Sequence, residues 1–285
     1  MNFKTLMEND KYLILPGVYD CLSAKMAQEA GFEALFLSGG ALSVAGYGKP
    51  DIGFLHTADY VRMAEKIIDV TGLPLLVDAD NGFGNAIHVA DLARQYVRVG
   101  AKGLQIDDQI VPQSVPSTHK EANCWELVEP KLKAIRDAVP DDFLLLFRTV
   151  TNFTDNVDEA IKRINRAYEL GADVAYIDGI KSEEELRKIA EEAEIPLMIN
   201  MNEKGVAANL PIDEVKELGY RIGLYPVSAM AVAANAMHDL FVDLKATATT
   251  LKHRDHMYNP VKVYNSMGLQ SLTDKYLPLY EHENE

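Results

Sequence analysis

Short apolar runs alternate with amphipathic stretches along almost the whole chain. Each run is brief and apolar on both faces, as in the buried strands of a parallel sheet. The runs fall at residues 12–15, 34–37, 75–78, 103–106, 143–147, 174–177, 197–199 and 221–224. The amphipathic stretches predict helices at 20–30, 57–70, 86–99, 124–138, 157–170, 182–193, 212–218 and 228–246. This alternation is typical of βα units rather than of separate strand-rich and helix-rich regions.

Glycine directly follows several of the predicted helices, at Gly31, Gly72, Gly100, Gly171 and Gly219. A glycine in this place readily takes the left-handed conformation that ends a helix. Its recurrence indicates one repeating architecture without an interdomain linker. Because eight βα units close a barrel, we expect a (β/α)₈ TIM barrel over residues 1–246.

The pattern changes after Ala246. Residues 247–285 carry scattered aromatic side chains and no further apolar run of strand type. We expect a C-terminal helical extension that packs on the barrel, covers its mouth or docks on another subunit.

Composition and charge narrow the class of protein. The chain has 285 residues, of which 48% are hydrophobic and 25% charged, as in a folded protein with a large core. Its net charge of -15 argues against nucleic acid or an anionic membrane as a partner. The two cysteines, Cys21 and Cys124, form no CxxC pair, so the sequence supports neither a disulfide framework nor a structural zinc site. The polar N-terminus and the lack of a long apolar run lead us to expect a cytoplasmic protein.

Carboxylates gather at the ends of two consecutive predicted strands, on the face where barrel enzymes carry their active sites. Asp78 and Asp80 end the third strand, and Asp107 ends the fourth. Strand alternation points Asp78 and Asp80 the same way, and Asp107 can reach the same pocket. Converging carboxylates repel one another unless a hard divalent ion, bound directly or through water, offsets their charge. We therefore predict a Mg²⁺ site at these three residues; the alternative is that they cap the following helices.

Other strand ends carry a cation and polar groups. Arg148 follows the apolar residues of the fifth strand, and its planar guanidinium suits a carboxylate held bidentately. The alternative for Arg148 is a buried ion pair with one of the aspartates. Asp178 ends the sixth strand, and Asn200 with Glu203 ends the seventh. We expect Asn200 to donate to a second carboxylate of the substrate. Asp178 and Glu203 either act on the substrate, support groups that do, or have a structural role.

The second strand is followed by Ser38, Gly39 and Gly40. Two glycines let backbone N–H groups approach an anion closely, and the serine hydroxyl adds a donor. The alternative is an ordinary tight turn.

Seven segments, in conserved order along the chain, closely resemble the isocitrate lyase and phosphoenolpyruvate mutase superfamily. The segments are LSGG at 37–40, KPDIGFL at 49–55, LPLLVDADNGFGN at 73–85, GLQIDDQ at 103–109, LFRT at 146–149, NMNEKG at 200–205 and LYPVSA at 224–229. NMNEKG and LYPVSA are most similar to the 2-methylisocitrate lyase branch. The resemblance covers roughly residues 12–245.

The resemblance implies a site and an assembly. Mg²⁺, or Mn²⁺ in its place, would be held by Asp78, Asp80 and Asp107, partly through waters. The 2-oxo acid end of a small carboxylic acid substrate would be surrounded by Ser38, Gly39, Gly40, Asp51 and Arg148. Such a site stabilises the enolate of pyruvate or a related acid. Members of the superfamily are usually homotetramers that exchange C-terminal helices between barrels, which would account for the strandless tail.

The chain departs from the resemblance in three places. The lyases carry a Lys-Lys/Arg-Cys-Gly-His loop whose cysteine acts as general acid or base, but residues 110–119 contain no cysteine, and Cys124 lies too far along. The phosphomutases and phosphonopyruvate hydrolases carry an Asp-Lys pair and a Lys-x-Asn-Ser loop, whereas Asp108 is followed by Gln109. The tyrosine that the lyases place before Leu-Ser-Gly is Phe36.

These observations favour a Mg²⁺-dependent lyase that makes or breaks a C–C bond beside a 2-oxo or 2-hydroxy acid. His119 or Tyr47 would replace the missing cysteine as proton donor. The alternatives are an oxaloacetate decarboxylase or hydrolase, phosphoenolpyruvate or phosphonopyruvate chemistry, and a non-catalytic paralogue that binds a small acid. The retained aspartates and Arg148 argue against the last of these.

Overall fold

The computed structural model describes residues 2–9, 12–112, 120–153 and 156–284. By its internal contacts the chain divides into two compact units, residues 1–230 and 231–285. The division falls inside helix α10 (Ser228–Thr247) rather than after residue 246, where the sequence pattern changes. The domain boundary at residue 246 stays a prediction.

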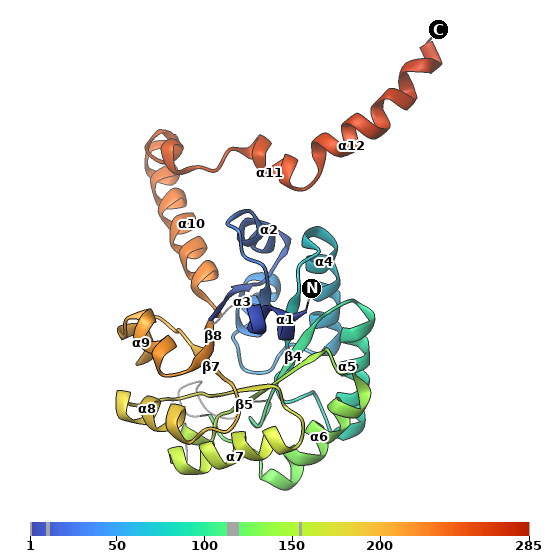
Figure 1. Ribbon diagram of the computed structural model, residues 1–285. Helices are drawn as coiled ribbons and strands as arrows, with labels where there is room; N and C mark the ends of the chain where they lie inside the picture. The colour runs from blue at the N-terminus through green and yellow to red at the C-terminus, as the bar shows by residue number, and fades with distance from the viewer. Residues whose placement is uncertain (1, 10–11, 113–119, 154–155, 285) are drawn as a thin grey trace. The chain divides into compact units, whose positions relative to one another are not determined.

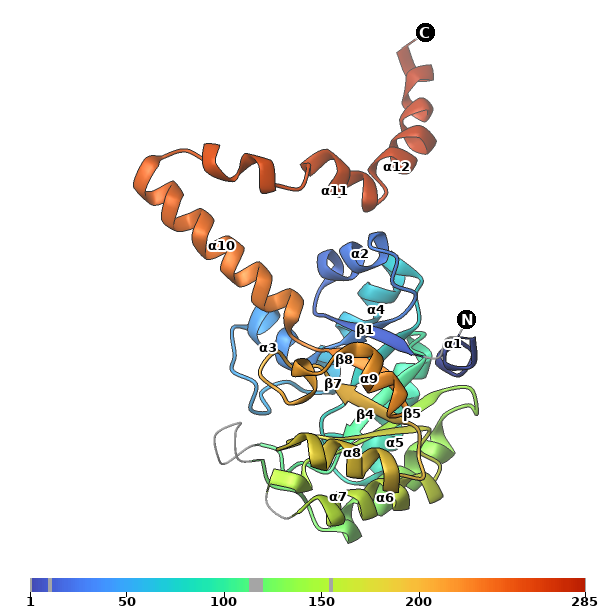
Figure 2. The same cartoon turned by 60° about the vertical axis from the view of Figure 1, so that its left-hand side comes forward.

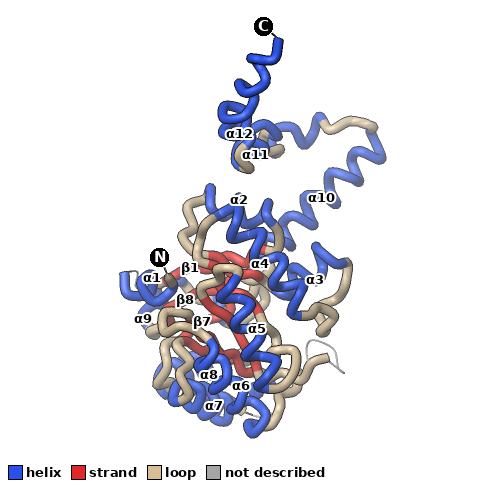
Figure 3. Tube along the Cα trace, turned by 90° about the vertical axis from the view of Figure 1, so that its right-hand side faces the viewer, coloured by secondary structure: helices blue, strands red, loops and turns tan. Residues whose placement is uncertain are grey.

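Eight parallel strands close a barrel in the first unit, in the order of the chain, with β8 paired to β1. Figures 1 and 3 show the strands at the centre of this unit and the helices around them. The strands are β1 (Leu13–Val18), β2 (Leu35–Leu37), β3 (Leu75–Asp78), β4 (Gly103–Asp107), β5 (Leu144–Thr149), β6 (Val174–Ile177), β7 (Leu197–Asn200) and β8 (Tyr220–Tyr225). The predicted (β/α)₈ fold and all eight predicted strands are confirmed.

The predicted helices are also present. They are α2 (Cys21–Glu29), α4 (Thr57–Thr71), α5 (Ala86–Arg98), α6 (Trp125–Ala138), α7 (Val157–Glu169), α8 (Glu183–Glu192), α9 (Ile212–Glu217) and α10. The first unit contains two helices that the pattern did not predict, α1 (Phe3–Asn9) and α3 (Gly39–Tyr47). The α3 sequence holds three glycines, which disfavour a helix, but Ser38 caps it by accepting a hydrogen bond from the Ala41 amide at 3.3 Å. The segment after β2 is therefore a helix start and not a tight turn.

Alternate residues of each strand face two different layers. In β5, Leu144 and Leu146 belong to the barrel interior, whereas Leu145 and Phe147 pack in the layer between strands and helices. Phe3 of α1 is fully buried in the interior cluster, and Figure 2 shows α1 beside the barrel strands. The interior series of β5 continues to Arg148, so this cation faces the inside of the barrel.

The second unit, taken by itself, is helical. It contains most of α10, then η3 (Leu251–His256), α11 (Pro260–Ser266), α12 (Leu269–Tyr276) and η4 (Leu277–Asn284). Among the described residues of α10, α11 and α12, none is buried. In the described part of the chain, no helix combines the length and the apolar character that a membrane span requires.

A buried ion pair ties the end of β4 to α7 on the outer side of the barrel. Asp108 is the residue after Asp107, so its side chain faces the helix layer and not the interior. Its carboxylate accepts hydrogen bonds from the Thr149 hydroxyl at 2.7 Å and the Val150 amide at 2.9 Å. It also forms an ion pair with Arg163 at 2.8 Å, and neither side chain is more than 11% exposed. Asp108 is therefore structural, although it is the neighbour of a predicted metal ligand.

Replacement of Asp108 by alanine should lower the free energy of unfolding by about 3–5 kcal/mol, because it leaves the Arg163 charge buried and unpaired. Urea denaturation followed by circular dichroism measures this loss. Asp69→Ala serves as the matched control, since Asp69 is exposed on α4 and should change stability little. Equal effects of the two substitutions would contradict a structural role for Asp108.

Candidate active site

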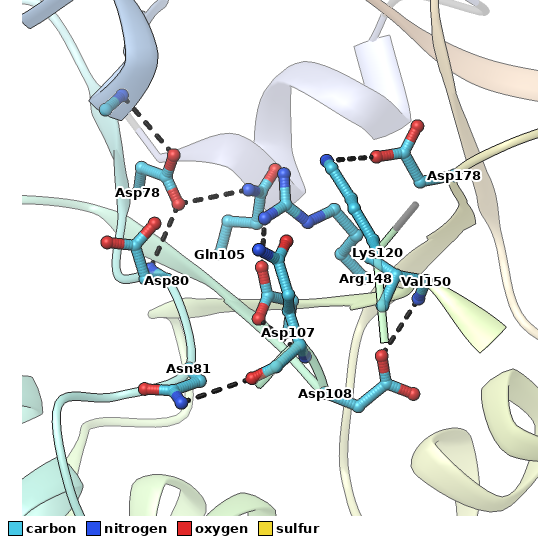
Figure 4. A network of polar contacts seen from close by, with 12 residues as sticks. Asp78, Asp80, Asn81, Gln105, Asp107, Asp108, Lys120, Arg148, Val150 and Asp178 are labelled. Atoms are coloured by element: carbon cyan, nitrogen blue, oxygen red, sulfur yellow. Dashed lines mark hydrogen bonds and ion pairs between the residues drawn. The ribbon is translucent and has the colours of Figure 1, made fainter. Parts of the chain in front are cut away.

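The register of neighbouring strands places polar groups side by side at the C-terminal end of the barrel. Asp78 of β3 pairs with Gln105 of β4. Asp107 of β4 pairs with Arg148 of β5, and Arg148 with Tyr176 of β6. Each of these residues belongs to the inward-facing series of its strand. The result is a continuous row of polar side chains across four strands, much of which is visible in Figure 4.

A cavity of about 570 Å³ opens over this row. Most of the predicted site residues lie along its wall, namely Ser38, Gly40, Asp51, Asp78, Arg148, Asp178 and Asn200. The structure thus brings together residues from β2, β3, β5, β6 and β7 that lie far apart in the sequence.

The acidic part of the site centres on Asp78, which is 6% exposed. Its carboxylate accepts hydrogen bonds from the Asp80 amide and from Gln105 Nε2, both at 3.2 Å. Burial raises the pKa of Asp78, and the Asp107 and Asp51 carboxylates raise it further against the opposing effect of Arg148. Burial also raises the pKa of Asp80 well above its ordinary value, with Asp78 as its strongest charged neighbour.

The backbone of Asp80 indicates that this position is constrained. Its φ of 42° lies in the left-handed region, which residues other than glycine seldom adopt. The Asp80 carboxylate accepts a hydrogen bond from the hydroxyl of Tyr60 at 3.1 Å. Such strain is typical of functional sites, where the surrounding structure holds a residue in an unfavourable conformation.

Arg148 pairs with Asp107. This is the buried ion pair with an aspartate that the sequence left open as the alternative role of Arg148. Nη2 donates to Asp107 Oδ2, and Nη1 donates to the Tyr176 hydroxyl at 3.3 Å. Although burial lowers the pKa of Arg148, the facing acids raise it well above its ordinary value, with Asp107 the strongest. Nε is buried and has no hydrogen-bond partner among the described residues. A guanidinium has five N–H donors, and the two bonds to Asp107 and Tyr176 leave others for a ligand in the cavity that Arg148 lines.

The donor chemistry of the acidic group fits Mg²⁺. Asp78, Asp80 and Asp107 offer hard carboxylate oxygens whose mutual repulsion is visible in the raised pKa values of Asp78 and Asp80. Within the described residues, however, no three His, Cys, Asp or Glu side chains are arranged as a ready cation cage. Asp107 instead faces Arg148. This arrangement suits an ion held by one or two carboxylates and several waters, which is the usual mode for Mg²⁺.

The two glycines at the start of α3 allow carboxylates to approach the helix closely. A Cβ atom at Gly39 would lie 2.3 Å from the Tyr60 hydroxyl oxygen and 2.8 Å from Asp78 Oδ2, and one at Gly40 would lie 2.8 Å from Asp51 Oδ2. The Gly39 amide donates to Asp78 Oδ2 at 3.3 Å. At Gly39, therefore, the predicted anion-binding amide serves a carboxylate of the protein itself.

Among the described residues, five predicted ones do not line the cavity: Gly39, Asp80 and Asp107, which contact residues of its wall or lie next to them in the chain, and Tyr47 and Glu203. Tyr47 lies at the far end of α3, is 38% exposed, and its hydroxyl interacts with Asp59. Glu203 is exposed and accepts a hydrogen bond from the Ser228 hydroxyl. The position of Tyr47 does not support its predicted role as proton donor. His119 lies outside the described residues.

The sequence reasoning missed Lys120, Gln105 and Tyr176, all of which line the cavity. Strand alternation could have found Gln105 and Tyr176, because both belong to the inward-facing series of their strands. Lys120 lies in a loop, so no periodic signal marks it. Its Nζ is 2.8 Å from Asp178 Oδ2. Although burial raises the pKa of Asp178, the charges of Lys120 and Arg148 bring it below its ordinary value.

A second and larger hollow, of about 780 Å³, lies beside α5 and α6. Its wall is mainly apolar and includes Ile87, Leu127 and Pro130. None of the predicted catalytic, substrate-binding or metal-binding residues in the described part of the chain lines it. The convergence of charged groups, and not the size of the hollow, therefore identifies the smaller cavity as the candidate active site.

Comparison with known proteins agrees with this geometry. The chain is 33% identical over 273 residues to 2,3-dimethylmalate lyase of Eubacterium barkeri, covering 95% of this chain and 94% of that protein. It is 31% identical over 280 residues to 2-methylisocitrate lyase of Bacillus subtilis (strain 168), covering 96% and 92%. Its fold matches the solved structure of oxaloacetate acetylhydrolase in complex with the inhibitor 3,3-difluorooxalacetate, with a TM-score of 0.88 at 29% identity and coverage of 96% and 94%.

The family itself is matched over nearly the whole barrel, since residues 3–245 match the phosphoenolpyruvate phosphomutase family. The superfamily resemblance carried by the seven sequence segments is thereby confirmed, and relatives named as lyases align along almost the full length of the chain. This chain belongs to the phosphoenolpyruvate phosphomutase family, within the isocitrate lyase and phosphoenolpyruvate mutase superfamily of enzymes.

Proposed function

We propose that this protein is a Mg²⁺-dependent lyase that cleaves or forms a C–C bond of a small 2-oxo or 2-hydroxy dicarboxylic acid through an enolate. The observation that carries the proposal is the meeting of Arg148 with a group of buried carboxylates around one cavity at the C-terminal end of the barrel. The names of two relatives, 2,3-dimethylmalate lyase and 2-methylisocitrate lyase, describe reactions of this class.

Arg148 is the group that binds the reacting end of the substrate. Arg148 lines the cavity and carries a positive charge, so it can hold a carboxylate or an oxygen that becomes negative during the reaction. Asp107 and Tyr176 hold the guanidinium in place from two sides. Ser38, at the start of α3, adds a hydroxyl and the positive end of a helix dipole to the same wall.

Asp78, Asp80 and Asp107 would hold Mg²⁺, in part through waters, with Mn²⁺ as an alternative ion. When bound, the ion supplies positive charge opposite an oxygen on which negative charge develops. The carboxylates keep the ion beside Arg148, and Asp51 borders the same space.

The proposed role of the second unit, residues 231–285, is assembly of the protein. Its helices expose large apolar side chains, among them Phe241 at 62%, Leu251 at 60% and Leu279 at 67%. Because water-exposed apolar surface of this kind marks interaction sites, we propose that the unit assembles the chain into a homotetramer, with helices exchanged between subunits.

Oxaloacetate decarboxylation or hydrolysis is the second candidate. Tyr47 lies away from the cavity, and Phe36 occupies part of its wall, so neither offers a hydroxyl for proton transfer there. Decarboxylation needs an electron sink more than a proton donor during bond cleavage, and the described site suits that need.

Turnover assays with Mg²⁺ test the proposal and separate the two candidates. We expect the enzyme to cleave 2,3-dimethylmalate, 2-methylisocitrate or a related acid and to release a 2-oxo acid or a dicarboxylate, detected by mass spectrometry. Release of CO₂, or of oxalate with acetate, from oxaloacetate would favour the second candidate. Absence of metal-dependent turnover of every one of these acids would overturn both.

Replacement of Arg148 by lysine should lower kcat/KM by about 100- to 1000-fold, because lysine keeps the charge but lacks the planar fork that binds an oxyanion and Asp107 together. Steady-state kinetics on the preferred substrate measure the effect. Arg94→Lys, a change at an exposed position on α5, is the control. Wild-type kinetics for Arg148→Lys would contradict the role given to this residue.

Mg²⁺ should raise the thermal unfolding temperature, and EDTA should reverse the rise, because an ion that binds only the folded state stabilises it by about 2.7 kcal/mol at 100 times its Kd. Because the pKa values of Asp78 and Asp80 are raised in the metal-free folded state, that state retains protons that the unfolded state has lost. The contribution of these two carboxylates to stability therefore falls as pH rises from their unfolded pKa values through their folded ones. Protons compete with the ion, so the rise should be larger at pH 8 than at pH 5. Differential scanning fluorimetry of the wild type and Asp78→Asn checks this; an equal Mg²⁺ effect in both proteins would count against the site.

A further inference from the structure

Acidic and basic side chains line different parts of the barrel mouth. The acidic residue Asp78 ends β3 and Asp80 follows it, whereas Arg148 lies near the end of β5. Lys120, from the loop after β4, reaches Asp178 at the end of β6, and Figure 4 shows its ammonium group on the same side as Asp178. Besides Arg148, the cavity therefore has the ammonium group of Lys120 on the side away from Asp78 and Asp80.

Backbone hydrogen bonds place Lys120 in this position. The Ile110 amide donates to the Glu121 carbonyl at 2.8 Å, and the Asn123 amide donates to the Asp108 carbonyl at 2.6 Å. These two bonds join the chain that leaves β4 to the chain that returns towards α6. Lys120 directly precedes this paired segment, and its ammonium lies 5.9 Å from the centre of the Phe153 ring. The backbone pairing thus fixes the base of the side chain, while Phe153 and Asp178 lie at its ammonium end.

The Lys120 ammonium has more N–H donors than it has hydrogen-bond acceptors among the described residues. A lysine carries three N–H donors, and within the described part of the chain Asp178 Oδ2 is the single hydrogen-bond acceptor for Lys120. Only 17% of the Lys120 side chain is exposed, so water can reach it from few directions. Donors of this kind that border a cavity suit an anionic group of a ligand.

The cavity has room for such a group. Ligand pockets of about 300–1000 Å³ enclose molecules much larger than a three-carbon acid. The volume here is about 570 Å³, so a substrate bound at Arg148 leaves space on the side of Lys120.

We propose that Lys120 is a specificity-determining residue that binds a second carboxylate of the substrate and so selects dicarboxylic over monocarboxylic acids. Asp178 is a positioning residue that holds the ammonium group in place. This assignment rests on the proposed function, because it takes the reacting end of the acid to lie at Arg148 and the metal carboxylates.

Lactate and malate provide a matched pair of probes, since malate is lactate with a second carboxylate on its methyl carbon. Their affinities are measured by calorimetry in the presence of Mg²⁺, with oxalate as a compact probe of the reacting end. We expect the wild type to prefer malate. In Lys120→Met, malate binding should weaken by about 10- to 100-fold, while lactate and oxalate bind as in the wild type.

Two further variants separate this role from a structural one. Lys188→Met removes another lysine that is paired with an aspartate, outside the cavity, and should leave all three affinities unchanged. Asp178→Asn keeps an oxygen that can accept from the Lys120 ammonium but removes the competing carboxylate charge, so it should keep or increase the preference for malate. If Lys120 only anchored its loop, both Lys120→Met and Asp178→Asn would weaken all three ligands alike.

The outcomes distinguish this proposal from the one on which it rests. An unchanged ratio of malate to lactate affinity in Lys120→Met, or an equal loss of oxalate binding, would overturn the role of Lys120 while leaving the proposed function intact. A wild-type protein that binds neither oxalate nor malate with Mg²⁺ would overturn the proposed function itself.

Discussion

Side chains on each barrel strand alternate between the interior and the helix layer, and every contact of the candidate site depends on this alternation. It turns Asp78, Gln105, Asp107, Arg148 and Tyr176 inward towards the C-terminal end of the barrel. The same rule turns Asp108 outward, where Arg163 and Thr149 hold it. Two adjacent aspartates thus have different roles, because Asp107 faces the barrel interior and Arg148 whereas Asp108 faces the helices.

The inward groups do not form a balanced set of charges. Burial and mutual repulsion raise the pKa values of Asp78 and Asp80, while Arg148 is shared between Asp107 and Tyr176. A protein that only needed stability would gain little from such an arrangement, since buried ion pairs are often no better than apolar residues of the same size. The imbalance is explained if the site must receive a cation and an anionic ligand together.

Close packing at the mouth makes this arrangement possible. Gly39 and Gly40 begin α3 where any Cβ atom would collide with Tyr60, Asp78 or Asp51. The helix start can therefore approach the carboxylates, and its amide at Gly39 becomes one of their hydrogen-bond donors. The loop after β4 adds a further cation, Lys120, which its paired backbone directs towards Asp178.

The sequence by itself determined the eight βα units, the closed barrel and several of the charged and polar residues that line the cavity, because parallel strands have a strong apolar signal and barrel sites lie at strand ends. Only the tertiary structure decided which partner each group takes: Arg148 with Asp107, Lys120 with Asp178, and Tyr47 with Asp59 outside the cavity. It also turned the Ser38 segment into a helix start, against the low helix propensity of its glycines. Strand periodicity is local and can be read along the chain, whereas the approach of a loop or helix end to a distant strand depends on packing between segments far apart in sequence.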